Sequence, residues 1–316
     1  MKTILLTGVA GFIGSSLTEK IIDKYKIIGV DDFNDFYNPL WKKDNIKPFV
    51  DHPNFRLYET DIRDFNKLKE IYSQNKIDKV VHLAARAGVR PSIINPLLYE
   101  EVNVKGTLNL LELTKEFGVS HFVSASSSSV YGNQKKVPFS ETDAVNEPVS
   151  PYAATKKAGE MLAYTYAKLY KIKTSCLRFF TVYGPKGRPD MAPYLFSKAL
   201  LSNEEINKFG DGSSSRDYTD IDDIVDGIER VIEEEFEFEI FNLGNNKPIS
   251  LNEFIKLLEK ITGKKAKIKT MSRQPGDVER TWADIKKAKR LLGWQPKTSL
   301  EEGLTKFVSW FIKNRL

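Results

Sequence analysis

The first half of the chain alternates short β-rich runs with helical patterns, and this alternation restricts the fold more than any other feature. The strand candidates are "KTILLTG", "KIIGVDD", "NFRLYETD", "DKVVHLAA" and "SHFVSASSSSV". Amphipathic stretches such as "FIGSSLTEKIIDKY" and "FNKLKEIYSQN" separate them. Nearly continuous apolar strands joined by helices indicate a parallel sheet covered on both faces. The sequence therefore predicts an α/β fold with a doubly wound parallel sheet.

After the strand candidate "IKTSCLRFF" the pattern changes to pieces marked by proline and glycine. In "TVYGPKGRPDMAPY" and "FGDGSSSRDYTDIDD" we expect loops to outweigh regular elements, which is typical of a smaller substrate-binding part. The later run "EFEIFNLG" is expected to be a strand that rejoins the main sheet. We predict a first domain over residues 1–180, to which 217–244 returns, and a smaller α/β domain over 181–316.

Composition excludes several classes of protein. The formal charge of +6 is spread among acids, as in "KLLEKITGKKAKIK", which favours solvated faces over a nucleic-acid partner. The initial apolar run is interrupted by glycines too early for a signal peptide or a membrane span. The only cysteine, Cys176, allows no intrachain disulfide, so we predict a cytoplasmic protein without a membrane partner.

The histidines do not form a metal-binding pattern. His52, His82 and His121 are scattered without ligand spacing, and with one cysteine we predict no metal site. His82 precedes "LAAR" on a strand candidate, and we expect it to be a hydrogen-bonded core residue.

The stretch "TGVAGFIGSS" places three glycines directly after a strand and at the start of a helix. Gly8 can form the tight turn, Gly11 lets the backbone approach a pyrophosphate, and Gly14 permits close packing of helix on sheet. The first helical residues, Phe12 and Ile13, contribute free N–H groups and partial positive charge toward phosphates. Glycines alone also fit a plain turn or another nucleotide; in this context they predict a Rossmann dinucleotide site.

Asp31 ends the second strand candidate, where a carboxylate can accept hydrogen bonds from both adenosine ribose hydroxyls and repel a 2′-phosphate. Asp32 follows it, and no arginine occurs in the next few residues, so NAD is favoured over NADP. A solvated turn aspartate is the alternative for Asp31. Asp61 is expected to contact the adenine amino group. The remaining cofactor contacts that we predict are Asn34, Ile62, Leu83, Ala84, Ala85 and Asn103.

"SPYAATKKAG" places Tyr152 and Lys156 four residues apart, on one face of a helix that begins at Ser150 and Pro151. A nearby ammonium and the helix N-terminus lower the pKa of Tyr152 from about 10 toward neutrality, which makes the phenol a usable general base. Lys156 is also expected to hold the nicotinamide ribose. Ser127, near the end of the fifth strand candidate, is expected to relay the proton. An incidental pair on a surface helix is the alternative.

In this order on a βαβ scaffold, the motifs resemble those of extended short-chain dehydrogenases/reductases over essentially the whole chain. "GVAGFIGSS", "HLAARAGVRPS", "SSSSVYG", "SPYAATKKAGE" and "RDYTDIDDIVDGI" resemble nucleotide-sugar epimerases. "VDDFNDFY", "LRFFTVYGPKGRPDM" and "QPGDVERTWAD" are most similar to UDP-glucuronate 4-epimerases. The resemblance implies an NAD-binding Rossmann domain over 1–180 and a nucleotide-sugar-binding domain over 181–316. It also implies tightly held NAD and conversion of UDP-glucuronate to UDP-galacturonate through a transient 4-keto sugar, with Tyr152 taking the proton of the 4-hydroxyl.

The resemblance further assigns contacts with the nucleotide. Arg216 of "SSSRDYTD" is expected to contact the diphosphate and Asp277 of "QPGDV" the uridine ribose. Phe209 of "NKFGDG" is expected to pack on the uracil, with a plain buried aromatic as the alternative.

The sugar is the harder assignment. Ser128, Ser129, Thr181 and Arg188 are expected to bind a hexuronate carboxylate. Such a clamp would hold the carboxylate near the ring plane and prevent decarboxylation of the β-keto acid. Ser127, the expected proton relay, is also a predicted substrate contact. Arg188 is also suited to the diphosphate. The remaining substrate contacts that we predict are Arg86, which stands where glucuronate epimerases commonly carry Gln, and Arg90.

Three alternatives remain open at the level of the sequence. They are a 4-epimerase of UDP-glucose or UDP-N-acetylglucosamine, a UDP-glucuronate decarboxylase, and a non-catalytic NAD-binding protein. The helical stretches "LLYEEVNVKGTLNLLELTK" and "YAATKKAGEMLAYTYAKLY" carry large apolar residues on more than one side, as family dimers that pair these helices would need. We therefore predict a homodimer, with burial inside the monomer as the alternative.

Overall fold

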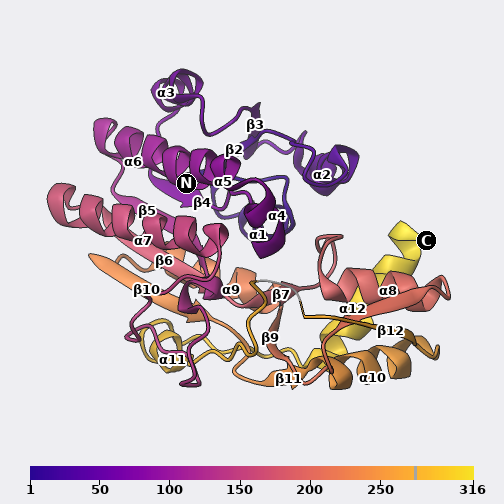
Figure 1. Cartoon of the computed structure of the whole chain (residues 1–316). Helices are drawn as coiled ribbons and strands as arrows, with labels where there is room; N and C mark the ends of the chain where they lie inside the picture. The colour runs from indigo at the N-terminus through magenta and orange to yellow at the C-terminus, as the bar shows by residue number, and fades with distance from the viewer. Residues whose placement is uncertain (274–275) are drawn as a thin grey trace. The chain divides into compact units, whose positions relative to one another are not determined.

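The computed structural model describes residues 1–273 and 276–316 and divides into two compact units (Figure 1). Unit 1 comprises 1–132, 144–178 and 225–241; unit 2 comprises 133–143, 179–224 and 242–316. This division differs from the predicted domains in the segment 133–143 and in the extent of the returning segment, which is 225–241 rather than 217–244. Phe139 N donates to Trp282 O (2.7 Å) and Asp284 N donates to Phe139 O (2.9 Å), so backbone pairing fixes the segment to unit 2.

Unit 1 is built on a seven-stranded sheet in the order β10-β6-β5-β4-β1-β2-β3. In that order the strands are Phe238–Leu243, Lys173–Phe179, His121–Ser127, Lys79–His82, Thr3–Thr7, Lys26–Asp31 and Phe55–Glu59. The pairs β1–β2, β2–β3, β1–β4 and β4–β5 are parallel. The predicted doubly wound α/β fold is therefore confirmed, and β10 joins the sheet beside β6 as expected.

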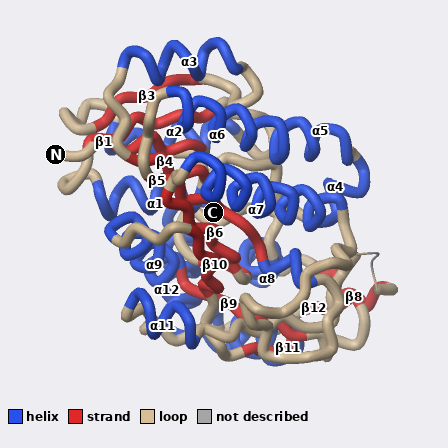
Figure 2. Tube along the Cα trace, turned by 90° about the vertical axis from the view of Figure 1, so that its left-hand side faces the viewer, coloured by secondary structure: helices blue, strands red, loops and turns tan. Residues whose placement is uncertain are grey.

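Helices connect these strands. They are α1 (Phe12–Ile21), α2 (Pro39–Ile46), η1 (Lys47–Phe49), α3 (Phe65–Gln74), α4 (Val89–Ile94), α5 (Pro96–Glu100), the π-helical turn η2 (Glu101–Lys105), α6 (Gly106–Glu116), η3 (Ser128–Tyr131), α7 (Pro151–Tyr170) and α9 (Ile221–Glu233). Figure 2 shows α6 and α7 running side by side, and α4 and α5 also contact α7.

The core of unit 1 explains why both faces of the sheet are covered. Leu5 and Val80 pack with Leu68 of α3, Leu110 of α6 and Tyr166 of α7 in one buried cluster. Neighbouring strand residues point to the opposite face, where Ile4 and Leu6 are also fully buried. Because crossovers between parallel strands are right-handed, we expect α1, which connects β1 to β2, to cover that second face.

The strand order reverses between β1 and β4, which are neighbours at the centre of the sheet. Strands to one side of this point connect forward through α1 and α2, and those to the other side through α6 and α7. In doubly wound sheets, ligands bind at the carboxyl ends of the strands beside such a switch point. The turn after β1 and the segment after β4 therefore flank the expected binding position.

The described residues of unit 2 form two small sheets and, apart from the first residues of α9, four helices. The sheets are β11-β9-β7 (Pro248–Ser250, Ser215–Asp220, Thr181–Tyr183) and the parallel pair β12-β8 (Lys267–Met271, Glu205–Phe209). The helices are α8 (Ala192–Leu201), α10 (Leu251–Thr262), α11 (Lys286–Leu292) and α12 (Leu300–Arg315). This is more regular structure than the proline and glycine pattern predicted between residues 181 and 223.

Aromatic side chains form the core of unit 2. Tyr218 stacks on Phe254 with ring centroids 4.5 Å apart, and Tyr194 meets Phe311 edge to face at 4.8 Å. Trp294 is fully buried, and its indole N–H donates to Asp223 O at 2.9 Å.

Across residues 1–273 and 276–316, no helix is long and apolar enough to cross a membrane.

Candidate active site

The glycine turn after β1 has the conformation that its three glycines predict. Gly8 has a positive φ of 72°, and a Cβ there would lie 2.7 Å from Ala84 N. At Gly14 a Cβ would lie 2.1 Å from Gly8 O, so only glycine lets α1 approach the turn this closely. At Gly11 the corresponding contact is 3.2 Å, also with Gly8 O.

The N-terminus of α1 is suited to a phosphate. Its N-cap residue, Gly11, provides no side-chain hydrogen bond, and the first turn, with Phe12 and Ile13, contains no acidic residue. The N–H groups of this turn therefore keep their partial positive charge for an anionic ligand. These features of the turn fit the pyrophosphate of a dinucleotide.

Asp31 ends β2 beside this turn and is buried, with an exposed fraction of 7%. Its carboxylate accepts hydrogen bonds from Ala10 N (3.0 Å) and Phe33 N (2.9 Å). Burial raises the pKa of Asp31, and the two N–H donors partly oppose that rise. Each carboxylate oxygen keeps acceptor capacity for a ribose hydroxyl. A solvated turn aspartate does not describe this side chain.

A buried lysine near Asp31 was not predicted from the sequence. Lys42 of α2 is 5% exposed, its ammonium donates to Asn34 O at 2.7 Å, and Asp31 and Asp32 oppose the lowering of its pKa by burial. Asp32 Oδ1 accepts from the backbone and side-chain nitrogens of Asn34. α2 was not predicted, although Asn38 caps it and Pro39 begins it, which is a recognisable start signal.

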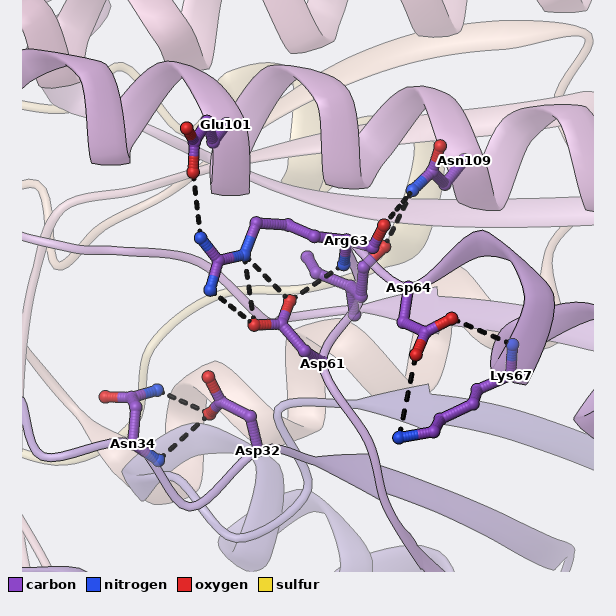
Figure 3. A network of polar contacts seen from close by, with 9 residues as sticks. Asp32, Asn34, Asp61, Arg63, Asp64, Lys67, Glu101 and Asn109 are labelled. Atoms are coloured by element: carbon purple, nitrogen blue, oxygen red, sulfur yellow. Dashed lines mark hydrogen bonds and ion pairs between the residues drawn. The ribbon is translucent and has the colours of Figure 1, made fainter.

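Asp61, predicted to contact adenine, is held by an arginine (Figure 3). The Arg63 guanidinium donates to both Asp61 oxygens (2.7–3.1 Å) and, through Nη1, to Glu101 at 2.8 Å. Burial raises the pKa of Asp61, but the bonds from Arg63 outweigh it and the net shift is downward. Ile62 is buried, and its carbonyl accepts from Asn109 Nδ2 at 3.0 Å. The adenine contact stays a prediction and would have to share this carboxylate with Arg63.

The segment after β4 is fixed to β1. Leu83 N donates to Thr7 O (3.1 Å) and Ala84 N to Thr7 Oγ1 (3.3 Å), so Leu83, Ala84 and Ala85 follow the central strand beside the glycine turn. His82 lies between Thr7 Oγ1 (2.8 Å) and Thr107 Oγ1 (3.0 Å), and burial lowers its pKa to about 3. The prediction of a hydrogen-bonded core histidine is confirmed.

Asn103 lies in η2 and links this segment to α7. Its Oδ1 accepts from Arg86 N (2.8 Å), and its Nδ2 donates to Arg86 O (3.0 Å) and Thr155 Oγ1 (3.1 Å). These bonds use both N–H donors of the amide. The predicted contact of Asn103 with the cofactor would therefore depend on its remaining acceptor capacity. Arg86 is half-buried, whereas Arg90, on α4, is exposed.

The start of α7 positions the candidate general base. Ser150 Oγ accepts from Ala153 N (3.1 Å) and Pro151 occupies the first turn, as predicted. Tyr152 is half-buried, and its ring meets Tyr99 edge to face at 6.2 Å. Lys156 follows one turn later on the same face.

Lys156 connects α7 with β5. Its ammonium is buried and donates to Ala125 O at 2.7 Å, two residues before Ser127. Burial lowers the pKa of Lys156 to about 8. Ser127 Oγ donates to Ser129 Oγ and accepts from Ser129 N, both at 3.1 Å. The structure thus brings the helix of Tyr152 and Lys156 against the strand of Ser127, and the next residue, Ser128, begins η3.

The remaining predicted substrate residues lie in unit 2. Thr181 begins β7 and Arg216 is on β9, its parallel neighbour. Phe209 ends β8 and is half-buried. Asp277 is exposed and follows Gln274 and Pro275 of the "QPGDV" motif, which lie outside the described residues. Backbone pairing of Ser215 with Glu279 and Arg280 brings that segment beside Arg216.

Arg188 does not stand open to a ligand. Its Nε and Nη2 donate to the two carboxylate oxygens of Asp190, at 2.9 and 2.5 Å. A substrate carboxylate would have to compete with this bidentate pair.

The described residues contain no cluster of three His, Cys, Asp or Glu side chains able to hold a metal ion.

Known proteins resemble this chain over nearly its full length. The model of the GDP-mannose 4,6 dehydratase family matches residues 5–307. A UDP-glucuronate 4-epimerase from Thermodesulfobacterium geofontis is 48% identical, over 99% of this chain and 97% of that protein. The crystal structure of a UDP-glucuronic acid 4-epimerase from Bacillus cereus, in complex with UDP-glucuronic acid and NAD, has a TM-score of 0.94 at 37% identity and covers 98% of this chain and 99% of its own.

A second structure is nearly as similar. The UDP-glucose 4-epimerase of Thermotoga maritima, solved with UDP-glucose, has a TM-score of 0.91 at 36% identity and covers 98% of this chain and 99% of its own. The fold, the glycine turn, the buried Asp31 and the Tyr152–Lys156 helix agree with these similarities. The chain belongs to the extended short-chain dehydrogenase/reductase family, in the group of nucleotide-sugar-modifying proteins that the GDP-mannose 4,6 dehydratase model describes.

Proposed function

We propose that this protein is an NAD-dependent UDP-hexuronate 4-epimerase that interconverts UDP-glucuronate and UDP-galacturonate. One observation carries the proposal: Tyr152 and the buried ammonium of Lys156 lie on a capped helix packed against the strand that ends at Ser127. The similarity to UDP-glucuronate 4-epimerases over the whole chain supports the same reaction.

The residues beside the glycine turn fit NAD. A Cβ would fill the space at Gly8 and Gly14, the first turn of α1 has no competing acid, and the Asp31 carboxylate has acceptor capacity for ribose hydroxyls. The carboxylates of Asp31 and Asp32 would repel the 2′-phosphate of NADP. Bound at this position, NAD would supply the acceptor for the hydride of carbon 4 and, in its reduced form, the donor that restores it. We propose that the predicted cofactor residues, including Asp61 and Asn103, contact it.

Tyr152 is the proposed general base and acid. It takes the proton of the 4-hydroxyl when the sugar is oxidised. It returns a proton to that oxygen when the 4-keto sugar, after rotating in the site, is reduced on its other face. The ammonium of Lys156 stabilises the phenolate. The hydroxyl of Ser127 relays the proton between the sugar oxygen and Tyr152. The pocket must hold the nucleotide firmly and leave the sugar ring free to rotate.

The hexuronate carboxylate is the group that separates this substrate from neutral sugars. We propose that Ser128, Ser129 and Thr181 bind it with hydroxyl groups, and that Arg188 contributes once Asp190 releases its guanidinium. Arg86 and Arg90 add positive charge. Held near the ring plane, the carboxylate cannot align with the carbonyl π system, so the β-keto acid keeps its carbon dioxide.

Arg216, Asp277 and Phe209 are the proposed contacts of the diphosphate, the uridine ribose and the uracil. We therefore propose that the Rossmann part of the chain binds NAD and that residues 181–316 supply the nucleotide-sugar contacts.

Purified protein tests the proposed reaction directly. Incubation with UDP-glucuronate should give an equilibrium mixture with UDP-galacturonate and no UDP-pentose, measured by anion-exchange chromatography and mass spectrometry. Tyr152→Phe should lower kcat by about 10³-fold, because proton transfer by a positioned group contributes this order of magnitude. Release of UDP-pentose, or unchanged turnover by the variant, would contradict the proposal.

A UDP-glucose 4-epimerase is the second candidate, because the Thermotoga maritima structure is nearly as similar and Arg188 is already paired with Asp190. The two candidates differ in kcat/KM for UDP-glucose and UDP-N-acetylglucosamine relative to UDP-glucuronate. Arg188→Met should reduce the value for UDP-glucuronate alone if the guanidinium binds the sugar carboxylate.

We also propose that the protein is a cytoplasmic homodimer. The helices α5, α6 and α7 expose the apolar side chains Leu97 (75% exposed), Leu108, Met161 (61%) and Leu169. A second copy that covers them would remove this area from water. Light scattering should give twice the monomer mass, and Met161→Glu should give monomers. Leu40→Glu, at an exposed leucine of α2, is the matched control. The location rests on Cys176, a buried thiol that suits a reducing compartment.

A further inference from the structure

A buried ion pair lies under the catalytic helix in unit 1. Glu160 of α7 is 3% exposed and Arg178 of β6 is 1% exposed. The guanidinium binds the carboxylate in bidentate geometry, with Nε–Oε1 at 2.8 Å and Nη2–Oε2 at 2.9 Å. Ser126 Oγ also donates to Oε1 at 2.7 Å, and Lys157 Nζ lies 3.4 Å from Oε2.

This single carboxylate is in contact with each element that carries a proposed reacting group. Glu160 follows Lys156 by one helical turn on α7, so the two lie on the same face. Ser126 immediately precedes Ser127 in β5. Because neighbouring strand residues point to opposite faces, a fixed Ser126 side chain also fixes the direction of Ser127.

Arg178 extends the connection to η3. Its guanidinium lies over the ring of Tyr131, 4.8 Å from the centroid, and Tyr131 is the last residue of the turn that contains Ser128 and Ser129. The network therefore joins α7, β5, β6 and η3 through directional contacts.

Stability alone does not explain why the buried pair of Glu160 and Arg178 is charged. Removing a carboxylate and a guanidinium from water is costly, and buried ion pairs can often be replaced by apolar side chains of similar volume with little loss of stability. Hydrogen bonds and bidentate pairs instead fix distance and orientation. A network at this position is suited to setting the register of α7 against the end of β5.

We propose that Glu160, together with Arg178 and Ser126, is a positioning residue that holds Tyr152, Lys156 and Ser127 at the spacing required for proton transfer. Glu160 touches none of the reacting atoms and acts through the two elements that it joins. The inference rests on the proposed function and adds to it three residues to which the sequence analysis assigned no role.

The charge of Glu160 also acts on Lys156. Burial lowers the pKa of that ammonium, whereas the carboxylate of Glu160 and the Cys176 sulfur raise it. His82 from β4, Cys176 from β6 and Glu160 from its own helix interact electrostatically with Lys156, and Tyr152 lies one turn before it on the same helix. Without the negative charge of Glu160, Lys156 should lose its proton at lower pH.

Glu160→Gln tests the proposal, with Glu229→Gln as the matched control. Glu229 is also buried and ion-paired, with Lys24 at 2.5 Å, but its partners lie on or just after α1, away from the catalytic elements. Glu160→Gln should lower kcat by up to about 10²-fold, the cost of a small misplacement of reacting groups, with KM changed less than kcat. Glu229→Gln should leave both unchanged. Equal kcat in Glu160→Gln and wild type would overturn the proposal.

A second measurement does not depend on the sugar substrate. In protein with ¹³Cε-labelled lysine, the Lys156 resonance, assigned by its absence in Lys156→Met, should titrate at lower pH in Glu160→Gln than in wild type. An unchanged titration would show that Glu160 does not act on Lys156. If wild type fails to epimerise UDP-glucuronate while this shift is present, the proposed substrate is wrong and the positioning role stands.

A double variant separates positioning from stability. Glu160→Met with Arg178→Met replaces the pair by apolar side chains and should regain most of the thermal stability that Glu160→Gln loses, without regaining kcat. Recovery of kcat together with Tm would mean that the network only stabilises the fold. Ser126→Ala, which removes one hydrogen bond and leaves the ion pair, should lower kcat by a smaller factor.

Discussion

The two units differ in how their strands find their neighbours. In unit 1, β1 pairs with β2, β2 with β3, and β4 with β5, so most neighbours follow one another along the chain. In unit 2, β8 (Glu205–Phe209) pairs with β12 (Lys267–Met271), and β9 pairs with both β7 and β11. Local patterns therefore specify much of unit 1, whereas unit 2 depends on contacts between distant segments. The following substitutions test that difference.

Gly14→Ala should have the largest effect on stability. The added Cβ would lie 2.1 Å from Gly8 O, a contact with backbone that no rotamer change can relieve. We expect a loss of about 3 kcal/mol in the free energy of unfolding, measured in urea, and loss of NAD binding.

Gly159→Ala is the control for that substitution. Gly159 lies inside α7, and its added Cβ would meet nothing within 4 Å. This variant should be more stable by about 1 kcal/mol, because alanine favours a helix interior over glycine. Equal stabilities of the two variants would show that the glycine turn does not limit the packing of α1.

Asp217→Ala should have nearly as large an effect in unit 2. The fully buried carboxylate of Asp217 accepts from Asn245 N (2.7 Å), Asn246 N (3.0 Å) and Ala283 N (2.9 Å). Without it three N–H groups lose their acceptor, which should cost about 3 kcal/mol. Hydrogen exchange should rise at these amides first. Asp222→Ala, at an exposed carboxylate paired with Lys306, should change stability by less than about 1 kcal/mol.

The pH dependence of kcat tests the chemistry assigned to unit 1. Burial lowers the pKa of Lys156 to about 8, so its ammonium is present below that pH and lost above it. If the ammonium stabilises the Tyr152 phenolate as proposed, kcat should fall as pH rises through about 8. A profile that stays flat to pH 10 would contradict the role of Lys156, provided that circular dichroism shows the protein folded over that range.

Ser250→Ala should have the smallest effect. Ser250 and Glu253 form a capping box at the start of α10, with Ser250 Oγ accepting from Glu253 N at 3.2 Å. Its loss should cost about 1 kcal/mol, measured by thermal unfolding. Ser299→Ala at the matching box of α12 should cost a similar amount. A much larger loss at either position would mean that these helices depend on their caps more than on packing.

Some elements could have been predicted and were not. Helix α9 buries Ile221, Ile224, Ile228 and Ile232 at helical spacing, a periodicity that the sequence analysis did not use. The short strands β7 and β11 are different, since each has three residues and is defined only by its pairing with β9. No local pattern specifies such strands, because their stability comes from hydrogen bonds to another segment.

The residues of the candidate site also fall into two groups: those that a local motif predicts and those that only the fold brings to the site. The glycine turn, Asp31, Ser150 and the Tyr152–Lys156 spacing were recognisable because each is a local motif with a physical reason for its spacing. Lys42 was missed because α2 brings it back toward Asp31 from a later part of the chain. Arg63, which binds the Asp61 carboxylate, and Asp190, which binds Arg188, change what those predicted residues can do. Whether each predicted residue contacts ligand stays a prediction.

The sequence by itself determined the doubly wound sheet and the turn that only glycine can form. It also determined the helix that Ser150 caps and that carries Tyr152 and Lys156 in its first turns. These follow from local rules of periodicity, capping and backbone conformation, which act over a few residues. Only the tertiary structure decided that Ser126, Glu160 and Arg178 meet beneath that helix, and that Lys156 is buried against β5. Burial and charge pairing depend on which distant segments pack together, and burial is what lowers the pKa of Lys156 to about 8.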